Sequence, residues 1–500
     1  MGIFDSLFNS TPKKPSFPPL SLYNTLGKEK QEFSLAPTAQ QVRMYNCGPT
    51  VYGRQHIGNL SAAVFANTIR RVLEMNGYSV KQVINITDFG HLSSDADEGE
   101  DKMAKGLKKE GKKFTMENMH ELATKYMELY FEDIRMLDID TEKVIFPRAS
   151  DYVPAMIAMI KTLEEKSYAY ATSDGVYFDT ARFQGYGALG GIDTANLKEG
   201  ARVAANPEKH NPTDFALWKF SAGHGGKNLG WDSPWGKGFP GWHLECSAMI
   251  NSILGKQIDI HTGGIEHIAT HHNNEIAQSE AVTGKKPLSR FWMHRAHIQM
   301  GNAKIAKSSG NVAYLSDVIE KGIHPLALRY WFLTSHYRQT SNFTWEAVEA
   351  AQTAFLRLHE KMNDVRAQQD IPVLERFRTA FIERLNDDLD TPGAIALLWE
   401  TIKDDSIAPE QLKAIFLFAD EALGIGFKIP DERLNAMLNS GETETRLDDL
   451  PNEIKVLLEK RGDARAEKDF KKADKLREEL EEKGYTVKDS PGGPQVFAKP

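Results

Sequence analysis

The strongest constraint on the fold is a strand, a glycine-containing turn and a helix within residues 44–77. The first residues of this stretch are apolar and β-prone, and Gly48-Pro49 ends the strand. Beyond Asn59, apolar residues recur with a helical period, and a second β-prone run then ends at Thr87. A strand, a helix and a strand of these lengths form a βαβ unit with parallel strands, which predicts an α/β fold.

The same stretch predicts where a ligand binds. Open parallel sheets bind ligands at the carboxyl ends of their strands, where Cys47 and Thr87 fall. A glycine turn that leads into a helix N-terminus directs free backbone N–H groups and the positive end of the helix dipole at an anion. His56 and Asn59 lie on this turn, and we expect their side chains to add donors there.

Bulk properties exclude some classes of protein. The 500 residues, 41% of them hydrophobic, suffice for two to four domains, and no apolar run is long enough to span a membrane. The first residues lack the pattern of a secretory signal. The two cysteines, Cys47 and Cys246, exclude a disulfide scaffold and favour a reducing compartment, so we expect a cytoplasmic protein. The net charge of −8 does not mark a nucleic-acid binder, although a basic face can lie on an acidic protein.

The middle of the chain predicts an inserted domain, at about residues 115–240, between two parts of the parallel sheet. Residues 91–113 are acidic and then basic with little apolar content, and they predict a mobile loop. The elements expected after this loop are helices at 114–137 and 152–165, a hairpin at 168–178, a strand at 214–219, a helix at 241–250, a strand at 258–261, a helix at 271–280 and strands at 291–294 and 297–300.

The last third of the chain is predicted to be helical. Two or three amphipathic helices fall within residues 373–423, and a polar, acidic linker follows at 439–451. Beyond the linker, residues 453–483 predict a charged helical hairpin with a short β-like tail. From the residues alone, this hairpin is either a salt-bridged solvent-exposed pair of helices or a binding region.

Four residues form a candidate metal site. His271 and Glu275 are four apart on a predicted helix, so they share one face, a spacing that more often marks a hydrogen-bonded surface pair. Cys47 and Cys246 are either buried apolar residues or members of this site. Together the four side chains suit a tetrahedral Zn²⁺, because soft sulfur disfavours Mg²⁺ and Ca²⁺. His272 follows His271 directly and leaves open which histidine would bind.

These segments resemble a known enzyme family. His56-Ile57-Gly58-Asn59 resembles the His-Ile-Gly-His signature of class I aminoacyl-tRNA synthetases, and the segments 45–52, 241–249 and 271–280 resemble the three zinc-ligand segments of cysteinyl-tRNA synthetases, in the same order. The resemblance implies a Rossmann-like catalytic domain at 20–345 that contains the insertion, a helical bundle at 346–438, and an anticodon-binding helical hairpin at 450–500. It also implies that the four metal ligands are Cys47, Cys246, His271 and Glu275.

The resemblance assigns the other site residues as well. His56, Gly58 and Asn59 would bind ATP, with Asn59 in place of the second signature histidine. Residues 304–308, Lys-Ile-Ala-Lys-Ser, resemble the Lys-Met-Ser-Lys-Ser signature, so Lys304 and Lys307 would clamp the pyrophosphate, although Ala306 lacks the hydroxyl of the usual serine. The residues that match the family's cysteine pocket are Thr87, Trp242 and His261, and Trp242 has a core position as its alternative.

The implied activity is that of a cysteine–tRNA ligase. It would use ATP with magnesium to activate L-cysteine as cysteinyl-adenylate and pass the cysteine to the 3′ end of tRNA(Cys), with one zinc ion per chain to select the thiolate. We expect a monomer with no membrane partner. Two rivals are a ligase that joins cysteine to an amino sugar, which would lack the helical C-terminal region, and a catalytically silent tRNA-binding paralogue, which His56, Lys304 and Lys307 disfavour. Residues 88–92, Asp-Phe-Gly-His-Leu, depart from the family's usual Asp-Asp-Lys continuation, as do about the next two dozen residues.

Overall fold

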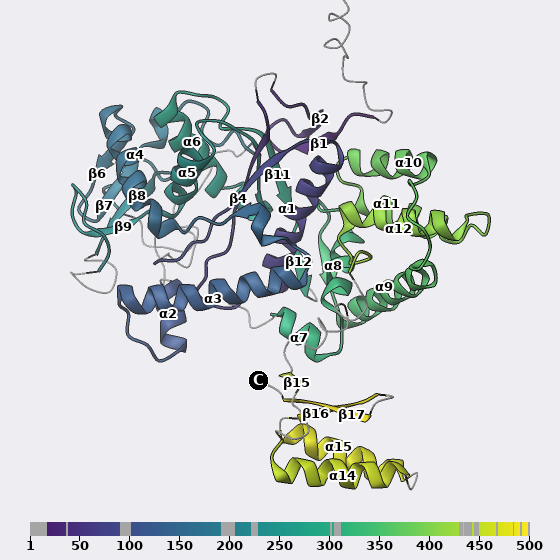
Figure 1. The fold of residues 1–500 in the computed structure, drawn as a ribbon. Helices are drawn as coiled ribbons and strands as arrows, with labels where there is room; N and C mark the ends of the chain where they lie inside the picture. The colour runs from purple at the N-terminus through teal and green to yellow at the C-terminus, as the bar shows by residue number, and fades with distance from the viewer. Residues whose placement is uncertain are drawn as a thin grey trace, which may run out of the picture. The chain divides into compact units, whose positions relative to one another are not determined.

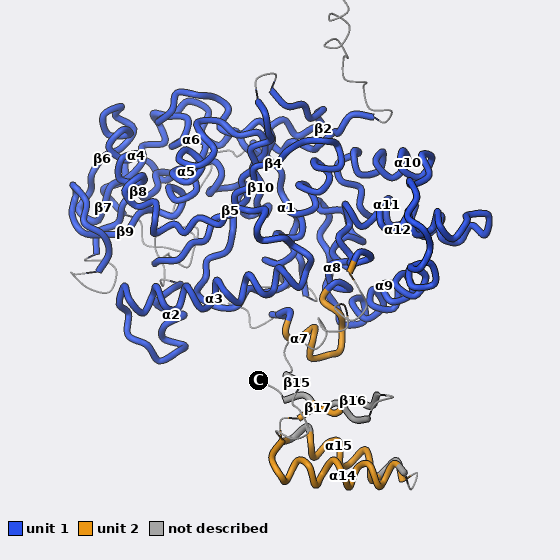
Figure 2. The backbone as a smooth tube through the Cα atoms, in the orientation of Figure 1, with its two compact units in different colours: residues 1–315, 326–428 blue, residues 316–325, 429–500 orange. Residues whose placement is uncertain are grey.

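The computed structural model describes most of the chain, in two compact units (Figure 2). The first unit contains residues 1–315 and 326–428, and the second contains residues 316–325 and 429–500. The residues that the structure describes are 18–36, 39–90, 102–191, 206–221, 229–300, 303–304, 312–429, 434, 443–444, 450–466, 469–483, 485–490 and 493–498.

The centre of the first unit is a five-stranded sheet with the strand order β11-β10-β3-β4-β5, and all of its neighbouring strands are parallel. Its strands are β3 (Val42–Asn46), β4 (Val80–Ile84), β5 (Val144–Ile145), β10 (Ile258–Gly264) and β11 (Ser289–Arg295). In β3, the side chains of Val42, Met44 and Tyr45 are fully buried, as expected of a parallel strand that is covered on both faces. The predicted α/β sheet is confirmed.

Helix α1 (Ile57–Met75) joins β3 to β4 and completes the predicted βαβ unit (Figure 1). It begins at His56, whose side chain accepts a hydrogen bond from the backbone N–H of Asn59. It ends near Gly77, which has a positive φ of 81° that a residue with a side chain rarely adopts. The carboxyl ends of β3 and β4 therefore lie at the same edge as the N-terminus of α1.

The inserted domain is shorter than the sequence predicted. Helix α3 (Met116–Met136) leads to β5, which pairs with β4, so residues 116–145 belong to the parallel sheet and its crossover. The insertion is built around a separate antiparallel sheet, β6-β7-β8-β9, within residues 169–240. Its strands are β6 (Ala169–Ala171), β7 (Gly175–Phe178), β8 (Phe215–Phe220) and β9 (Gly238–Pro240). The predicted start at 115 was wrong because β5 has only two residues, too few for a visible strand pattern.

The second correction concerns the predicted loop at 91–113. Residues 91–101 lie outside the described part of the chain, but Lys102–Lys109 form the helix α2. α2 buries Met103 and Leu107 and packs against α3 (Figure 1). Its fit depends on Gly106, where a Cβ atom would lie 2.5 Å from the carbonyl oxygen of Tyr52. Met103, Gly106 and Leu107 have the spacing of one helix face, but the many charged residues around them give this stretch the composition of a loop.

The remaining elements of the first unit surround the sheet. Helices α5 and α6 follow the insertion, and four helices of a bundle, α9 to α12, follow the last strands (Figure 1). Their bounds, with those of the shorter elements, are β1 (Ser21–Asn24), β2 (Glu29–Glu32), α4 (Val153–Glu165), α5 (Trp242–Ile253), α6 (His271–Thr283), β12 (Ile298–Met300), β13 (Ala303–Lys304), α8 (Pro325–Leu333), β14 (Ser341–Phe343), α9 (Trp345–Val365), α10 (Glu375–Asn386), α11 (Thr391–Thr401) and α12 (Pro409–Leu423).

The second unit confirms the predicted helical hairpin and β-like tail. Helices α14 (Asn452–Ala466) and α15 (Phe470–Glu482) pack against each other, and β15 (Thr443–Glu444), β16 (Tyr485–Ser490) and β17 (Gly493–Ala498) form an antiparallel sheet. This small unit has a core of its own, which contains Leu450, Ile454, Leu457, Leu458, Leu480, Val487 and Val496.

Candidate active site

A cavity of about 1230 Å³ opens at the carboxyl edge of the parallel sheet. Its inner part is lined by Cys47, Cys246 and His271, and its middle part by the turn that precedes α1. Helix α2 contributes four lysines to the wall. The cavity thus lies where an open α/β sheet binds its ligands.

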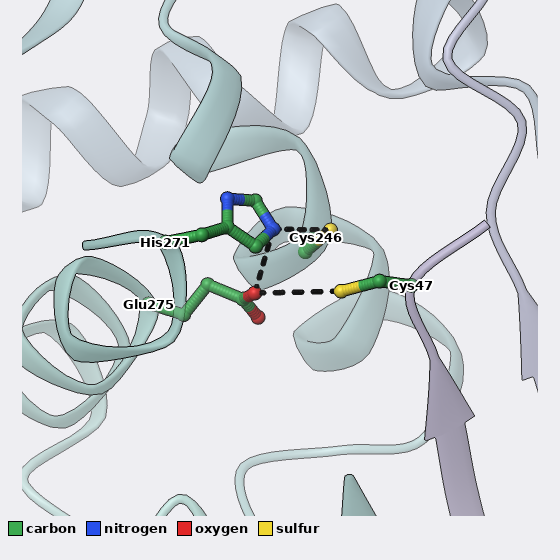
Figure 3. A group of neighbouring side chains, drawn as sticks. All are labelled: Cys47, Cys246, His271 and Glu275. Atoms are coloured by element: carbon green, nitrogen blue, oxygen red, sulfur yellow. Dashed lines mark hydrogen bonds and ion pairs between the residues drawn. The ribbon is translucent and has the colours of Figure 1, made fainter. Parts of the chain in front are cut away.

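The four predicted metal ligands converge on one point (Figure 3). Cys47 follows β3, Cys246 lies on α5, and His271 and Glu275 lie one turn apart on α6. The four ligand atoms are all within 4.8 Å of one another. His271 Nε2 is 3.6 Å from Cys246 Sγ and 2.9 Å from Glu275 Oε1, and Glu275 Oε1 is 3.9 Å from Cys47 Sγ.

These distances fit a tetrahedral zinc ion. With usual Zn–S, Zn–N and Zn–O lengths, neighbouring ligands of a tetrahedral site lie about 3.4–3.8 Å apart. The sulfur–nitrogen and sulfur–oxygen distances are already close to this range. Of these three distances, only that between His271 and Glu275 is shorter than the range, because the two side chains form an ion pair, and a separation greater by roughly 0.5 Å would bring it into the range. The donor set of two sulfurs, one nitrogen and one oxygen therefore fits zinc.

A second set of four shares two residues with the first. Cys47, His261, His272 and Glu275 also have ligand atoms within 4.8 Å of one another. His272 Nε2 is 3.3 Å from Cys47 Sγ, and its Nδ1 is 2.8 Å from Nε2 of His294. The ambiguity between the two adjacent histidines therefore persists in the structure, and the first set differs by having a second sulfur.

Burial, and contacts among the four predicted metal ligands, determine the protonation states of these four side chains. Burial raises the pKa of the Cys47 thiol well above its usual value, and Cys246 adds to this effect. Burial also acts to raise the pKa of Cys246, but hydrogen bonds with Cys47 and His271 outweigh it and lower that pKa to about 6. Burial acts to lower the pKa of His271, whereas Glu275 and Cys246 raise it to about 10.

The carboxyl of Glu275 completes this charge distribution. Its burial opposes ionisation, but His261 and His271 lower its pKa to about 2. At neutral pH, without a metal ion, the set therefore contains the thiolate of Cys246, the carboxylate of Glu275, a protonated His271 and a neutral Cys47 thiol. Two of the four side chains must lose a proton before all four can bind a cation.

The turn before α1 presents the signature residues to the cavity. His56, Gly58 and Asn59 all line it, and the first backbone N–H groups of α1 follow directly. The side chain of His56 is tied to the turn, since its Nδ1 accepts the Asn59 N–H at 3.2 Å. The side-chain amide of Asn59 donates one of its two N–H groups to Gln55 Oε1, so the expected donation toward a ligand would come from the second.

Comparison with known proteins identifies the family. A model described as the class I (C) catalytic domain of tRNA synthetases matches residues 34–353, and one described as the cysteinyl-tRNA ligase anticodon binding domain matches residues 447–496. Cysteine–tRNA ligase 1 of Burkholderia lata is 44% identical over 484 residues, which are 96% of this chain and 97% of that protein. The chain belongs to the cysteinyl-tRNA synthetase family. The cysteine–tRNA ligase of Treponema denticola is 38% identical and covers 95% of this chain and 98% of its own.

Solved structures agree with this family on the fold. Methionyl-tRNA synthetase of Mycobacterium tuberculosis, in complex with methionyl-adenylate, has a TM-score of 0.56 at 12% identity and covers 83% of this chain and 95% of its own. The predicted family, the class I synthetase α/β fold and the class of enzyme, an aminoacyl-tRNA ligase, are thereby confirmed. In the part of the chain that the structure describes, no helix has both the length and the apolar character to cross a membrane.

Of the residues that match the cysteine pocket of cysteinyl-tRNA synthetases, one lines the cavity and two are buried. Trp242 lines the cavity and stacks on His271 at a ring-centroid distance of 4.2 Å, and its role in binding cysteine stays a prediction. Thr87 and His261 are fully buried behind the wall. Thr87 Oγ1 donates to Glu245 Oε2 at 2.6 Å, and His261 Nε2 lies 2.9 Å from Glu275 Oε2.

The second signature of the cysteinyl-tRNA synthetase family is described only in part. The backbone of Lys304 pairs with Gln299 in the short antiparallel ladder of β12 and β13. Nothing is described of its side chain, and Lys307 lies outside the described residues. The assigned roles of both lysines therefore stay predictions.

Several side chains around the site were not predicted from the sequence. His243, three residues before Cys246 on α5, lies with its Nδ1 2.8 Å from Nδ1 of His271 and so fixes the ring of that ligand. Arg54 lines the cavity and donates to the buried carboxylate of Asp133 on α3, at 2.8 Å. The spacing of His243 on its helix was a usable signal, whereas the partner of Arg54 is 79 residues away.

Proposed function

We propose that the chain is a cysteine–tRNA ligase that forms cysteinyl-adenylate from L-cysteine and ATP with magnesium, and then transfers cysteine to the 3′ end of tRNA(Cys). The observation that carries this proposal is the set Cys47, Cys246, His271 and Glu275, which fits zinc at the inner end of a synthetase cavity. The catalytic and anticodon-binding family models and the names of the relatives support the same activity.

The metal site would explain how cysteine is selected. One zinc ion held by these four side chains would supply a bond to the substrate thiolate that the hydroxyl of serine and the methyl groups of valine cannot replace. An apolar pocket alone discriminates such small differences by only about 1–3 kcal/mol. Trp242 lines the same cavity and covers one face of the His271 ring, at a ring-centroid distance of 4.2 Å.

The protein's own groups would then act on the phosphates of ATP. Attack of the cysteine carboxylate on the α-phosphorus develops charge on the phosphate oxygens, and the N-terminus of α1 with His56 offers donors to that charge. Lys304 and Lys307 would neutralise the departing pyrophosphate. Because Asn59 replaces a histidine, hydrogen bonding rather than proton transfer would stabilise the transition state at this turn.

We assign residues 20–345 to catalysis, 346–438 to the helical bundle and 450–500 to the recognition of the anticodon. The anticodon-binding family model, which matches 447–496, argues against a ligase that joins cysteine to an amino sugar. The two unpaired cysteines support a reducing, cytoplasmic location. We further propose that the enzyme acts as a monomer.

Pyrophosphate exchange with each of the twenty amino acids tests the proposal. We expect ATP–pyrophosphate exchange with cysteine only, and cysteine attachment to a tRNA(Cys) transcript but not to a tRNA(Ser) transcript. His56→Ala, which removes a donor from the turn, is the matched inactive control. Exchange with serine at a comparable kcat/KM, or no exchange with cysteine, would refute the proposal.

A further inference from the structure

Part of the cavity wall is formed by lysines of α2 that have no role in the proposed adenylate formation or metal binding. α2 carries Lys102, Lys105, Lys108 and Lys109, and all four line the same cavity as the signature turn. The ammonium group of Lys102 lies 5.6 Å from the ring centroid of Trp242. The other three lysines are exposed, and in the described part of the chain no carboxylate forms an ion pair with them.

The packing of α2 keeps the helix face that carries the lysines directed toward the cavity. Met103 and Leu107 are buried on the opposite face, and Gly106 allows the helix to approach the carbonyl of Tyr52, which itself lines the cavity. A rise of about 1.5 Å per residue separates the first and last lysines by roughly 10 Å along the helix. The result is a row of positive charges along one face of α2, and the first of them lies beside Trp242.

This row suits a ligand with several phosphates in sequence. The cavity of about 1230 Å³ is larger than the roughly 300–1000 Å³ of ordinary small-molecule sites, so there is room beyond one nucleotide and one amino acid. Lysines contact phosphates as point charges and read no base sequence. In a chain with a net charge of −8, a polyanion needs such a local basic surface to approach.

We propose that α2 binds the backbone phosphates of the single-stranded 3′ end of tRNA and guides the terminal ribose toward the metal and the signature turn. The proposal rests on the proposed function, because it requires that tRNA be the acceptor. It assigns a task to residues 102–109, which lie within the segment in which this chain departs from the usual family sequence.

The test removes the three exposed charges. For the triple variant Lys105→Gln, Lys108→Gln, Lys109→Gln, we expect weaker binding of a tRNA(Cys) transcript, measured by fluorescence anisotropy, and a weaker salt dependence. With a slope of about −0.7 per neutralised phosphate of a single strand, the loss of three contacts lowers the log–log slope by about 2. The ratio of variant to wild-type Kd should therefore shrink about 15-fold between 50 and 200 mM salt.

Two controls distinguish the loss of positive charge on α2 from the loss of the same charge elsewhere on the protein. The variant Lys256→Gln, Lys285→Gln, Lys361→Gln loses three exposed lysines outside the cavity and should retain the wild-type salt slope. Replacing the three α2 lysines by arginine keeps the charge and should restore the affinity. Equal losses in the α2 variant and the control variant would overturn the proposal.

Two further measurements identify the bound phosphates. The α2 substitutions should cost little against a transcript that lacks its four 3′-terminal nucleotides, and should change the KM for ATP in cysteine-dependent pyrophosphate exchange by less than twofold. If the loss is the same for the full and the shortened transcript, or if the KM for ATP rises with the Kd for tRNA, the proposal is wrong. Absence of cysteine-dependent exchange in the wild-type protein would instead refute the proposed function.

Discussion

The two overlapping ligand sets make opposite predictions for Cys246 and His272. Serine at position 246 has nearly the size of cysteine but no soft sulfur, and Cys246 is buried, so the change removes one soft ligand and leaves the packing around it nearly unchanged. His272→Gln removes a ring that contacts Cys47 Sγ at 3.3 Å but is not a ligand in the first set. The two variants therefore separate a ligand from a neighbour that orients a ligand.

The expected magnitudes follow from the number of ligands. Structural zinc sites bind with about 10–16 kcal/mol, so each of four ligands contributes roughly 2.5–4 kcal/mol. At about 1.4 kcal/mol for each factor of ten, Cys246→Ser should weaken zinc binding about 100- to 1,000-fold. A group that only orients a ligand is worth about 10- to 100-fold, so His272→Gln should have the smaller effect.

The assay is competition between the metal-free protein and a zinc-binding fluorescent indicator at fixed pH, with elemental analysis for the stoichiometry. We expect one zinc per chain in the wild-type protein and the order wild type, His272→Gln, Cys246→Ser in falling affinity. If His272→Gln weakens binding more than Cys246→Ser, the second set holds the metal and our assignment is wrong. If wild-type protein contains no zinc, the site itself is refuted.

Four other predictions test other parts of the protein. Because Cys47 is a thiol and His271 is protonated without metal, zinc binding between about pH 6 and 10 should release two protons and tighten about 100-fold per pH unit, which calorimetry in buffers of different ionisation enthalpy will check. Lys307→Ala should lower kcat and kcat/KM of pyrophosphate exchange together while the Kd for cysteine stays near wild type, and an unchanged exchange rate would contradict the clamp. Deletion of residues 450–500 should leave exchange nearly intact but raise the KM for tRNA by orders of magnitude, whereas equal aminoacylation at matched salt would make this segment purely structural. Gly106→Ala places a Cβ 2.5 Å from a carbonyl oxygen and should lower the free energy of unfolding by about 1–3 kcal/mol in urea titrations, so wild-type stability would contradict the described fit of α2.

The fold was predictable wherever a periodic pattern was long. α1 has 19 residues and a marked apolar face, and β3 and β4 bury most of their residues, so the βαβ unit followed from period and turn chemistry. α2 has eight residues, and its many lysines hide a narrow buried face, so the sequence predicted a loop instead. β5 is only two residues long, and its place in the sheet depends on a long-range pairing with β4 that no local pattern contains.

The sequence predicted which residues belong to the candidate site better than it predicted which of their side chains contact one another. The four-residue spacing of His271 and Glu275 fixed half of the ligand set locally, and the resemblance supplied both cysteines. That His272 lies close to Cys47, and that the Thr87 hydroxyl faces Glu245, depends on contacts between residues more than 150 apart in the chain. Such contacts are set by the packing of whole elements, about which a single sequence says little.

The strand order has a consequence for synthesis on the ribosome. β3 lies between β4 and β10, but β10 begins only at residue 258, and Glu275 follows Cys47 by 228 positions. At roughly 5–20 residues per second, translation leaves one edge of β3 unpaired for about 10–40 s after that strand emerges. Throughout this interval the nascent chain presents an open strand edge beside a lone thiol, a surface prone to association and oxidation. The pairing of β3 with β10 and the completion of the candidate ligand set therefore fall close together in time, so a metal ion that needs all four side chains would be loaded only after residue 275 has been made.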